Sequence, residues 1–291
     1  MPELPEVETI VRGLARALPG RGVADVWGSG LPLRLGRPVD LFALKAIFGG
    51  RRFTGVRRRG KYILLDVDHD RAGAVVHLGM SGRLRLQRSG DSRAPHTHVV
   101  WSLAGSGIGG RGDELRFIDP RRFGWVRAAP ALDAVPELAA LGPDPLAELT
   151  VEDLATRLAA SRAPIKAFLL DQRRVAGLGN IYACEALARA GVHPATPAFL
   201  VRRHAPALLA AIRAALDAGI ANRGTTLRDY VDADGGAGDN HAALLVYDRA
   251  GAPCFRCGTP IRRRIDAARS TYFCPRCQRR PGGRAVTLRV R

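Results

Sequence analysis

Apolar positions near the start of the chain follow the period of an α-helix. Across residues 3–18, apolar side chains recur at the 3.6-residue spacing, at Val7, Ile10, Val11, Leu14 and Leu18. Gly20 follows, and glycine is common just past a helix end. The pattern predicts one amphipathic helix that buries its apolar face.

From about residue 23 to residue 129 the pattern becomes that of β-strands. Short runs rich in β-branched and aromatic residues are separated by glycine-rich turns. The clearest runs are residues 62–67, 74–78, 84–86, 98–103, 115–118 and 125–126. This arrangement predicts a β-sandwich or barrel.

Helical periodicity returns after Thr150. Segments 151–160, 164–172, 181–190 and 198–221 repeat at helix spacing. Prolines at positions 136, 143 and 145 indicate a linker over residues 131–149. We therefore expect an α+β chain with a β-rich domain over residues 1–130, the linker, a helical domain over residues 150–240 and a C-terminal module over residues 241–291.

Four cysteines near the C-terminus are spaced like the ligands of a zinc site. Cys254 and Cys257 form one Cys-x-x-Cys pair, and sixteen residues separate it from a second pair, Cys274 and Cys277. A disulfide is the alternative, which an intracellular chain disfavours. With four sulfur ligands the metal is structural, so any catalysis must come from elsewhere. Cys184, the fifth cysteine, lies in an apolar helical segment and is expected in the core.

The charge of the chain indicates a polyanionic partner. Its 291 residues carry 45 Lys plus Arg against 27 Asp plus Glu, a formal net charge of +18, and only three of the basic residues are lysine. Arginine pairs bidentately with phosphates and base edges, so nucleic acid is the leading candidate, although nucleotide bias in a genome also enriches arginine. No apolar run approaches the ~20 residues of a membrane span, and the acidic start is unlike a signal peptide. We expect a protein that stays inside the cell and binds no membrane.

The first residues, Met1-Pro2-Glu3-Leu4-Pro5-Glu6, offer a nucleophile. A small second residue favours removal of the initiator methionine, which makes the secondary amine of Pro2 the terminus. Since an α-amino group titrates near ~7.7 to 8.0, a useful fraction is unprotonated at neutral pH. Its attack on an aldehydic carbon gives a cationic iminium that promotes elimination, and Glu3 can move protons. Helix initiation alone also explains these residues, because proline and carboxylates suit the first turn.

Six motifs, in order from end to end, resemble the formamidopyrimidine-DNA glycosylase family. They are residues 1–9 (Met-Pro-Glu-Leu-Pro-Glu-Val-Glu-Thr), 59–62 (Arg-Gly-Lys-Tyr), 77–82 (His-Leu-Gly-Met-Ser-Gly), 119–124 (Asp-Pro-Arg-Arg-Phe-Gly), 179–183 (Gly-Asn-Ile-Tyr-Ala) and the two cysteine pairs. Leu4 and Val7 resemble this family more than the related endonuclease VIII.

The resemblance implies a base-excision repair enzyme that acts on duplex DNA. It would excise oxidised purines such as 8-oxoguanine and formamidopyrimidines, then cut the abasic strand by β- and δ-elimination. Pro2 would form a Schiff base with the sugar, and Glu3 would handle protons there. The implied fold is an N-terminal β-sandwich, a helix-two-turn-helix domain and a zinc-ribbon hairpin, with one structural zinc ion and no catalytic metal. A cytoplasmic monomer that associates with the nucleoid through DNA is implied.

Contacts with phosphates come from the same resemblance. Lys61 matches a position that contacts the phosphate beside the lesion and donates a proton in elimination. Arg269 matches an arginine that grips the same phosphate region. Asn180 matches an asparagine that binds phosphate together with the amides of a helix start. Lys166 is similar to a lysine implicated in handling the oxidised base.

A flipped nucleotide leaves a hole in the duplex that must be filled. Met80, Arg121 and Phe123 match the three inserting residues of the family, and their chemistry fits: methionine is pliable, phenylalanine can wedge between bases, and arginine can pair with the orphaned base. Without the resemblance, Met80 and Phe123 would be taken for core residues. His96 matches a histidine that contacts DNA.

Residues 234–241, Asp-Gly-Gly-Ala-Gly-Asp-Asn-His, depart from the family pattern, which has an aromatic pair after the glycine in a loop that caps the flipped purine. The departure bears on base preference and leaves the lyase chemistry intact. Asp248 also replaces a common glycine, for which we have no physical account. The alternatives are an endonuclease VIII-like glycosylase that prefers oxidised pyrimidines, a non-catalytic zinc-ribbon DNA-binding protein and a basic RNA-associated protein.

Overall fold

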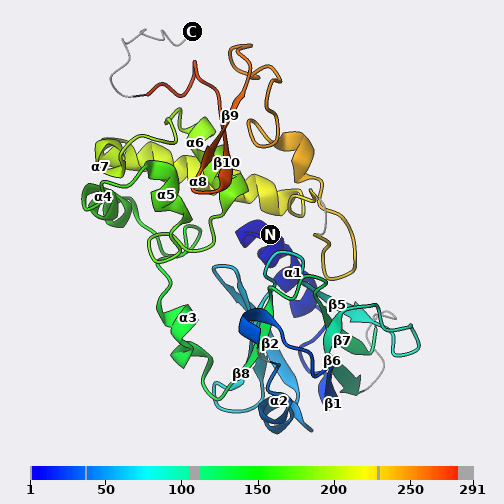
Figure 1. Ribbon diagram of the computed structural model, residues 1–291. Helices are drawn as coiled ribbons and strands as arrows, with labels where there is room; N and C mark the ends of the chain where they lie inside the picture. Colours follow the sequence, from blue (N-terminus) through cyan, green and yellow to red (C-terminus); the bar gives the residue numbers. More distant parts are fainter. Residues whose placement is uncertain (1, 37, 105–111, 228–229, 281–291) are drawn as a thin grey trace. The chain divides into compact units, whose positions relative to one another are not determined.

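The computed structural model describes residues 2–36, 38–104, 112–227 and 230–280 (Figure 1). Contacts between Cα atoms divide the chain into two compact units. Unit 1 contains Met1–Leu141 and Asp217–Ala243, and unit 2 contains Gly142–Leu216 and Leu244–Arg291. The expected α+β class is confirmed, while the domain boundaries expected from the sequence stay predictions.

Unit 1 is built on two four-stranded antiparallel sheets, with the strand orders β1-β6-β7-β5 and β2-β3-β4-β8. Their strands are β1 (Gly22–Gly28), β2 (Phe53–Arg59), β3 (Tyr62–Val67), β4 (Gly73–His77), β5 (Arg83–Gln87), β6 (Thr97–Ala104), β7 (Glu114–Ile118) and β8 (Trp125–Ala129). Alternate residues of both sheets enter one apolar core, which confirms the predicted β-sandwich.

Helix α1 (Leu4–Ala15) packs its apolar face into that core. Val7, Ile10 and Leu14 are each at most 1% exposed. Burying side chains of this size contributes about 1.5–3 kcal/mol each. The predicted N-terminal helix is therefore confirmed, and its packing fixes the start of the chain against the sandwich.

A second helix, α2 (Leu41–Phe48), lies within the region predicted to be β. The run Leu-Phe-Ala-Leu-Lys-Ala-Ile-Phe contains one polar residue, so periodicity cannot distinguish a buried helix from a strand. The residue that could have indicated a helix is Asp40, whose carboxylate caps it by accepting the N–H of Ala43 at 2.9 Å. Leu44 and Phe48 are fully buried.

The predicted linker, residues 131–149, is partly a packed element. It contains the 3₁₀ turn η3 (Leu132–Ala134) and the short helix α3 (Pro136–Ala139). Leu132, Val135 and Leu138 form an apolar cluster with side chains of β3 and β4 that face away from the main core. This first part of the segment therefore covers the second sheet.

Unit 2 is helical and ends in a hairpin. Its elements are α4 (Val151–Ala159), α5 (Ile165–Leu170), α6 (Asn180–Arg189), α7 (Ala198–Val201), the first part of α8 (Ala205–Ala221), and the antiparallel strands β9 (Arg262–Asp266) and β10 (Arg269–Phe273). Cys184 is fully buried, as predicted.

One described stretch, Ala198–Ala221, is long and apolar enough by composition to cross a membrane. Within it, Leu208, Ile212 and Leu216 are fully buried inside unit 2. A core helix shows the same combination of length, hydropathy and burial.

Candidate active site and zinc centre

Pro2 and Glu3 lie at the buried start of α1. Glu3 is the N-cap, and the carboxylate of Glu6 accepts its backbone N–H at 2.8 Å, which completes a capping box. Glu3 and Glu6 are at most 2% exposed. The helix therefore fixes the backbone on which the expected nucleophile lies. Met1, whose removal is expected, lies outside the described residues.

The second oxygen of Glu6 holds a segment 219 residues away in sequence. Its Oε1 accepts the N–H of Thr225 at 2.7 Å. The hydroxyl of Tyr230 donates to the carbonyl of Arg223 at 3.0 Å, and burial together with the charge of Glu6 raises the pKa of Tyr230. Nothing in the local sequence indicates this pairing. Glu6 is thus a site residue that sequence reasoning missed, and the capping-box spacing to Glu3 is the signal that could have found it.

The turns that carry the expected inserting residues are joined through Asp119, which is fully buried. The Ser81 hydroxyl donates to Asp119 Oδ1 at 2.6 Å, and the Gly124 N–H donates to its Oδ2 at 2.7 Å. The N–H of Asp119 in turn donates to the carbonyl of His96 at 3.0 Å. Asp119 therefore brings three turns together, two through its carboxylate and the third through its backbone N–H.

Met80 and Phe123 project from these joined turns and are 40% and 46% exposed. At this exposure neither side chain belongs to the core, and an exposed apolar side chain fits an inserting role. The guanidinium of Arg121 lies over the Phe123 ring, with 4.8 Å from Cζ to the ring centroid. His96 is also exposed. The structure thus places all four residues in one cluster of turns, while their DNA contacts stay predictions.

Beside this cluster, three rings occupy opposing positions on neighbouring strands. Tyr62 pairs with His77 and His77 pairs with Trp125, with ring centroids 5.0 Å and 6.1 Å apart. Burial, followed by the charges of Arg34 and Lys61, lowers the pKa of His77 to about 4. The neutral imidazole accepts the N–H of Gly79 at Nδ1, 3.1 Å away, just before Met80.

Sequence reasoning assigned no role to His77, although it opens one of the six motifs. Its position opposite Tyr62 follows from strand register, which the sequence alone does not fix. Lys61, which precedes Tyr62, is 6% exposed. The site therefore has a buried lysine next to a histidine that is kept neutral.

In unit 2, two expected site residues hold the hairpin just after Arg269. Lys166, 3% exposed, donates from Nζ to the Ser270 carbonyl at 3.0 Å and to Thr271 Oγ1 at 2.7 Å. Asn180, the first residue of α6, donates from Nδ2 to the same carbonyl at 2.9 Å. Arg269 itself is exposed. The structure therefore gives Lys166 a positioning contact, and its role at the oxidised base stays a prediction.

The buried carboxylate of Glu185 in α6 binds the segment that leads into the zinc module. It accepts the backbone N–H groups of Leu245, Val246 and Tyr247 at 2.9, 2.9 and 3.0 Å. It also pairs with Arg189 at 2.7 Å. Sequence reasoning missed Glu185, because a glutamate in an apolar helix gives no sign of its distant partners.

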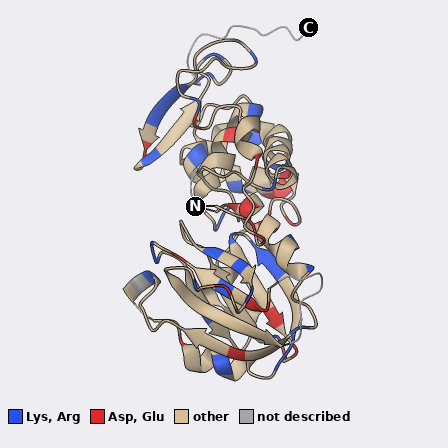
Figure 2. Ribbon diagram, turned by 90° about the vertical axis from the view of Figure 1, so that its right-hand side faces the viewer, with Lys and Arg blue, Asp and Glu red and all other residues tan. Residues whose placement is uncertain are grey.

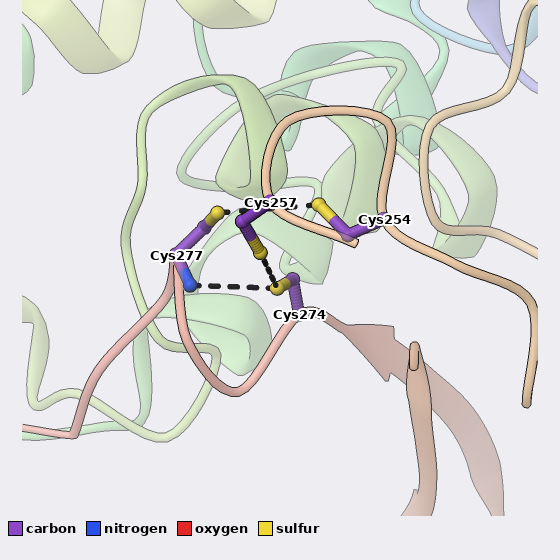
Figure 3. A group of neighbouring side chains, drawn as sticks. All are labelled: Cys254, Cys257, Cys274 and Cys277. Carbon is purple, nitrogen blue, oxygen red and sulfur yellow. Dashed lines mark hydrogen bonds between the residues drawn. The ribbon is translucent and has the colours of Figure 1, made fainter. Parts of the chain in front are cut away.

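The four cysteines of the C-terminal module converge, and their sulfur atoms lie within 4.8 Å of one another (Figure 3). Two of the sulfur pairs are 3.9 Å (Cys254–Cys277) and 3.5 Å (Cys257–Cys274) apart. Tetrahedral zinc with bonds of about 2.3 Å requires sulfur atoms about 3.8 Å apart. A hydrogen bond from Thr259 is the main cause that lowers the pKa of Cys257 to about 6, whereas burial raises the pKa of Cys274 and Cys277. The cluster fits a structural zinc ion.

Lys and Arg residues are spread over both units, and the hairpin beside the zinc site is rich in arginine (Figure 2). Arg262, Arg263 and Arg264 lie in succession on β9, and Arg269 begins β10. Asp266 forms an ion pair with Arg264 at 2.6 Å. The remaining arginines give the hairpin a positive surface suited to phosphates.

Comparisons with known proteins find relatives for each part of the chain. Family models match residues 1–126 (formamidopyrimidine-DNA glycosylase N-terminal domain), 141–231 (its H2TH domain) and 251–280 (a zinc finger found in FPG and IleRS). Formamidopyrimidine-DNA glycosylase of Methylococcus capsulatus is 46% identical over 96% of this chain and 100% of its own length.

Solved structures show the same likeness. The Thermus thermophilus protein has a TM-score of 0.82 at 38% identity and covers 96% of this chain and 99% of its own. The Lactococcus lactis protein covers 96% of this chain and 100% of its own. A mutant of it was solved with DNA containing Fapy-dG, at TM-score 0.85 and 31% identity, and a complex with abasic-site DNA has TM-score 0.84 and 32% identity. The chain therefore belongs to the formamidopyrimidine-DNA glycosylase family, as a bifunctional DNA glycosylase and AP lyase with a structural zinc finger.

Proposed function

We propose that this chain removes oxidised purines from duplex DNA and then cuts the abasic strand with Pro2 as the nucleophile. The observation that carries this proposal is the position of Pro2 and Glu3, buried and fixed by the capping box of α1. A nucleophile on a rigid helix start can be held close to the geometry of attack. The protein acts as a monomer on nucleoid DNA in the cytoplasm.

The reaction uses the terminal nitrogen of Pro2, side chains of the protein and water. The Pro2 nitrogen bonds to C1′ of the damaged nucleotide and gives up its N–H proton, while the base leaves with the electrons of its C1′–N bond and takes up a proton. Opening of the sugar, with a proton from Glu3 to the ring oxygen, gives an iminium between Pro2 and C1′. Because the iminium draws electrons, a C2′ proton is lost and the 3′ phosphate leaves. A second elimination releases the 5′ phosphate, and water then frees Pro2.

The remaining residues bind the strand on either side of this chemistry. Lys61, buried beside neutral His77, contacts the phosphate next to the lesion and supplies a proton in elimination. Met80, Arg121 and Phe123 fill the space of the flipped nucleotide. Their attachment to one buried carboxylate makes them a single rigid wedge.

Unit 2 supplies the phosphate clamp of the proposed enzyme. Arg269 binds the phosphate region and assists the second elimination. Lys166 and Asn180 donate to the carbonyl of Ser270, the residue after Arg269. Asn180 also begins α6, and the N-terminal end of this helix binds a phosphate. The zinc ion keeps the hairpin folded, because all its ligands are protein sulfur atoms.

The test is capture of the covalent intermediate. Borohydride added with abasic duplex should reduce the iminium and leave protein linked to DNA. Pro2→Gly should weaken this trapping, while Glu3→Gln should impair base removal from a lesion duplex. Full trapping by Pro2→Gly would refute the assigned nucleophile.

Base preference is tested separately, since the 234–241 segment departs from the family pattern. Release of 8-oxoguanine and thymine glycol from matched duplexes should favour the oxidised purine. Preferential release of thymine glycol would instead support the endonuclease VIII-like alternative.

A further inference from the structure

The segment that departs from the family pattern, residues 234–241, contributes one side of a polar neck, which we define as residues 222–225 paired with residues 238–240. The N–H of Asp239 donates to the carbonyl of Asn222 at 2.9 Å, and Thr225 forms a β-bridge with Asp239. All these residues belong to unit 1. The neck therefore has a defined backbone pairing that brings its two sides together.

Asn240 lies inside this neck and is 3% exposed. Its Oδ1 accepts a hydrogen bond from Asn222 Nδ2 at 3.1 Å, and its Nδ2 donates to Thr225 Oγ1 at 2.9 Å. Its backbone N–H donates to the carbonyl of Gly224 at 3.1 Å. A buried amide with this many partners specifies one arrangement, because each group left unpaired costs about 1–3 kcal/mol.

The neck connects directly to the start of the chain. Thr225, 4% exposed, receives the Asn240 amide on its hydroxyl and donates its backbone N–H to Glu6 at 2.7 Å. The same carboxylate accepts the N–H of Glu3 at 2.8 Å. A continuous series of buried hydrogen bonds thus runs from Asn240 through Thr225 and Glu6 to Glu3, next to Pro2.

We propose that Asn240 is a positioning residue for the Pro2–Glu3 terminus and acts through Thr225 and Glu6. The proposal rests on the proposed function, in which Pro2 is the nucleophile. When the Asn240 amide is absent, Thr225 loses the contact that orients it, and its N–H no longer aligns with Glu6. The Glu6 carboxylate then loses one of its fixed partners, and the Glu3 backbone becomes less constrained.

The expected effect is on the chemical step. Attack by Pro2 requires near-contact geometry, and a displacement of about 1 Å can lower such a rate about 100-fold. DNA affinity comes mainly from phosphate contacts elsewhere on the protein, so it should change little. A fall in trapping rate at unchanged affinity separates positioning from general destabilisation.

The experiment uses the full-length protein and two variants that break the series at different points. Asn240→Leu removes the amide at similar volume, and Thr225→Val removes the hydroxyl acceptor. Thr225→Ser keeps the hydroxyl and serves as the conservative rescue. Asp239→Asn is the matched control, because it removes only the ion pair with Arg223. The side chains of Asp239 and Arg223 are 72% and 56% exposed, so this pair contributes little to stability.

Three quantities are measured for each protein: the rate of borohydride trapping on abasic duplex, the Kd for a duplex with a tetrahydrofuran abasic analogue, and the Tm. Asn240→Leu and Thr225→Val should slow trapping about tenfold or more, with Kd within about threefold. Thr225→Ser and Asp239→Asn should trap like the unaltered protein. The double variant should be no slower than the worse single variant, since both act through one connection.

Unchanged trapping in both Asn240→Leu and Thr225→Val would overturn the proposal. A loss of affinity equal to the loss of trapping, with a large fall in Tm, would also overturn it in favour of a purely structural neck. Failure of the proposed function gives a different result. In that case the unaltered protein is not trapped on abasic duplex, or Pro2→Gly is trapped as fast as the unaltered protein.

Discussion

Acidification should destabilise unit 1 through His77. Its imidazole is kept neutral by burial and by the charges of Arg34 and Lys61, which lower its pKa from 6.5 to about 4. In the unfolded chain the same group titrates near 6.5. Between these values the unfolded state binds more protons than the folded state, so stability is full above pH 6.5 and falls as the pH is lowered toward 4.

The magnitude follows from the pKa gap. Each pH unit inside the window costs up to about 1.4 kcal/mol, and the imidazole is not completely shielded, so we expect a total of about 2–3 kcal/mol. Protonation at Nδ1 also removes the acceptor for the Gly79 N–H. The turn that carries Met80 should loosen over the same pH range.

Tryptophan fluorescence isolates this effect. The three tryptophans, at positions 27, 101 and 125, are all in unit 1, and Trp125 is the ring stacked on His77. Urea unfolding of the native protein and of His77→Gln is compared at pH 7.5, 6.5, 5.5 and 4.5. Other groups titrate in both proteins and cancel. The native protein should lose about 2 kcal/mol more than the variant across this range. Parallel pH dependences would refute the assignment of a depressed pKa.

Three further predictions concern unit 2. Cys257→Ser should abolish zinc retention and DNA binding but leave the tryptophan-monitored unfolding of unit 1 unchanged; unchanged affinity would argue against the hairpin as a DNA clamp. Lys166→Met should destabilise the hairpin by about 2–3 kcal/mol, because it removes a buried charged donor from two acceptors, and faster zinc loss to a chelator reports this. Ala268→Gly should slow zinc loss through a gain of about 0.5–1 kcal/mol, since Ala268 has φ of +60°; faster loss would contradict that reasoning.

Local patterns predicted the parts of the fold that local physics determines. The strand expected at residues 62–67 is β3 with those bounds, because alternation and its flanking turns both mark it. Helix α2 was missed because its run is apolar all around, so its periodicity carries no information. The packing of residues 131–141 on the second sheet was missed because prolines mark breaks in regular structure and do not show what a segment covers.

Within the site, spacing along the sequence was sufficient to predict a cluster only at the zinc centre, where the four ligands lie in two Cys-x-x-Cys pairs. Glu6, His77 and Glu185 act through partners that are distant in sequence or on a neighbouring strand. Such contacts depend on tertiary pairing, which a single sequence does not specify. Lys166 is a different case: its role at the oxidised base stays a prediction, and its contact with the hairpin is seen only in the structure.

Unit 1 is formed by two segments that are distant in sequence, and this has a consequence for the order in which the protein folds during synthesis. Its first segment ends at Leu141, yet the second, Asp217–Ala243, is translated only after the first segment of unit 2, Gly142–Leu216, has been synthesised. Until then the Glu6 carboxylate lacks its hydrogen bond from the Thr225 N–H. The start of α1 therefore acquires its Thr225 contact only late in synthesis, and a fragment cut at residue 141 would lack it.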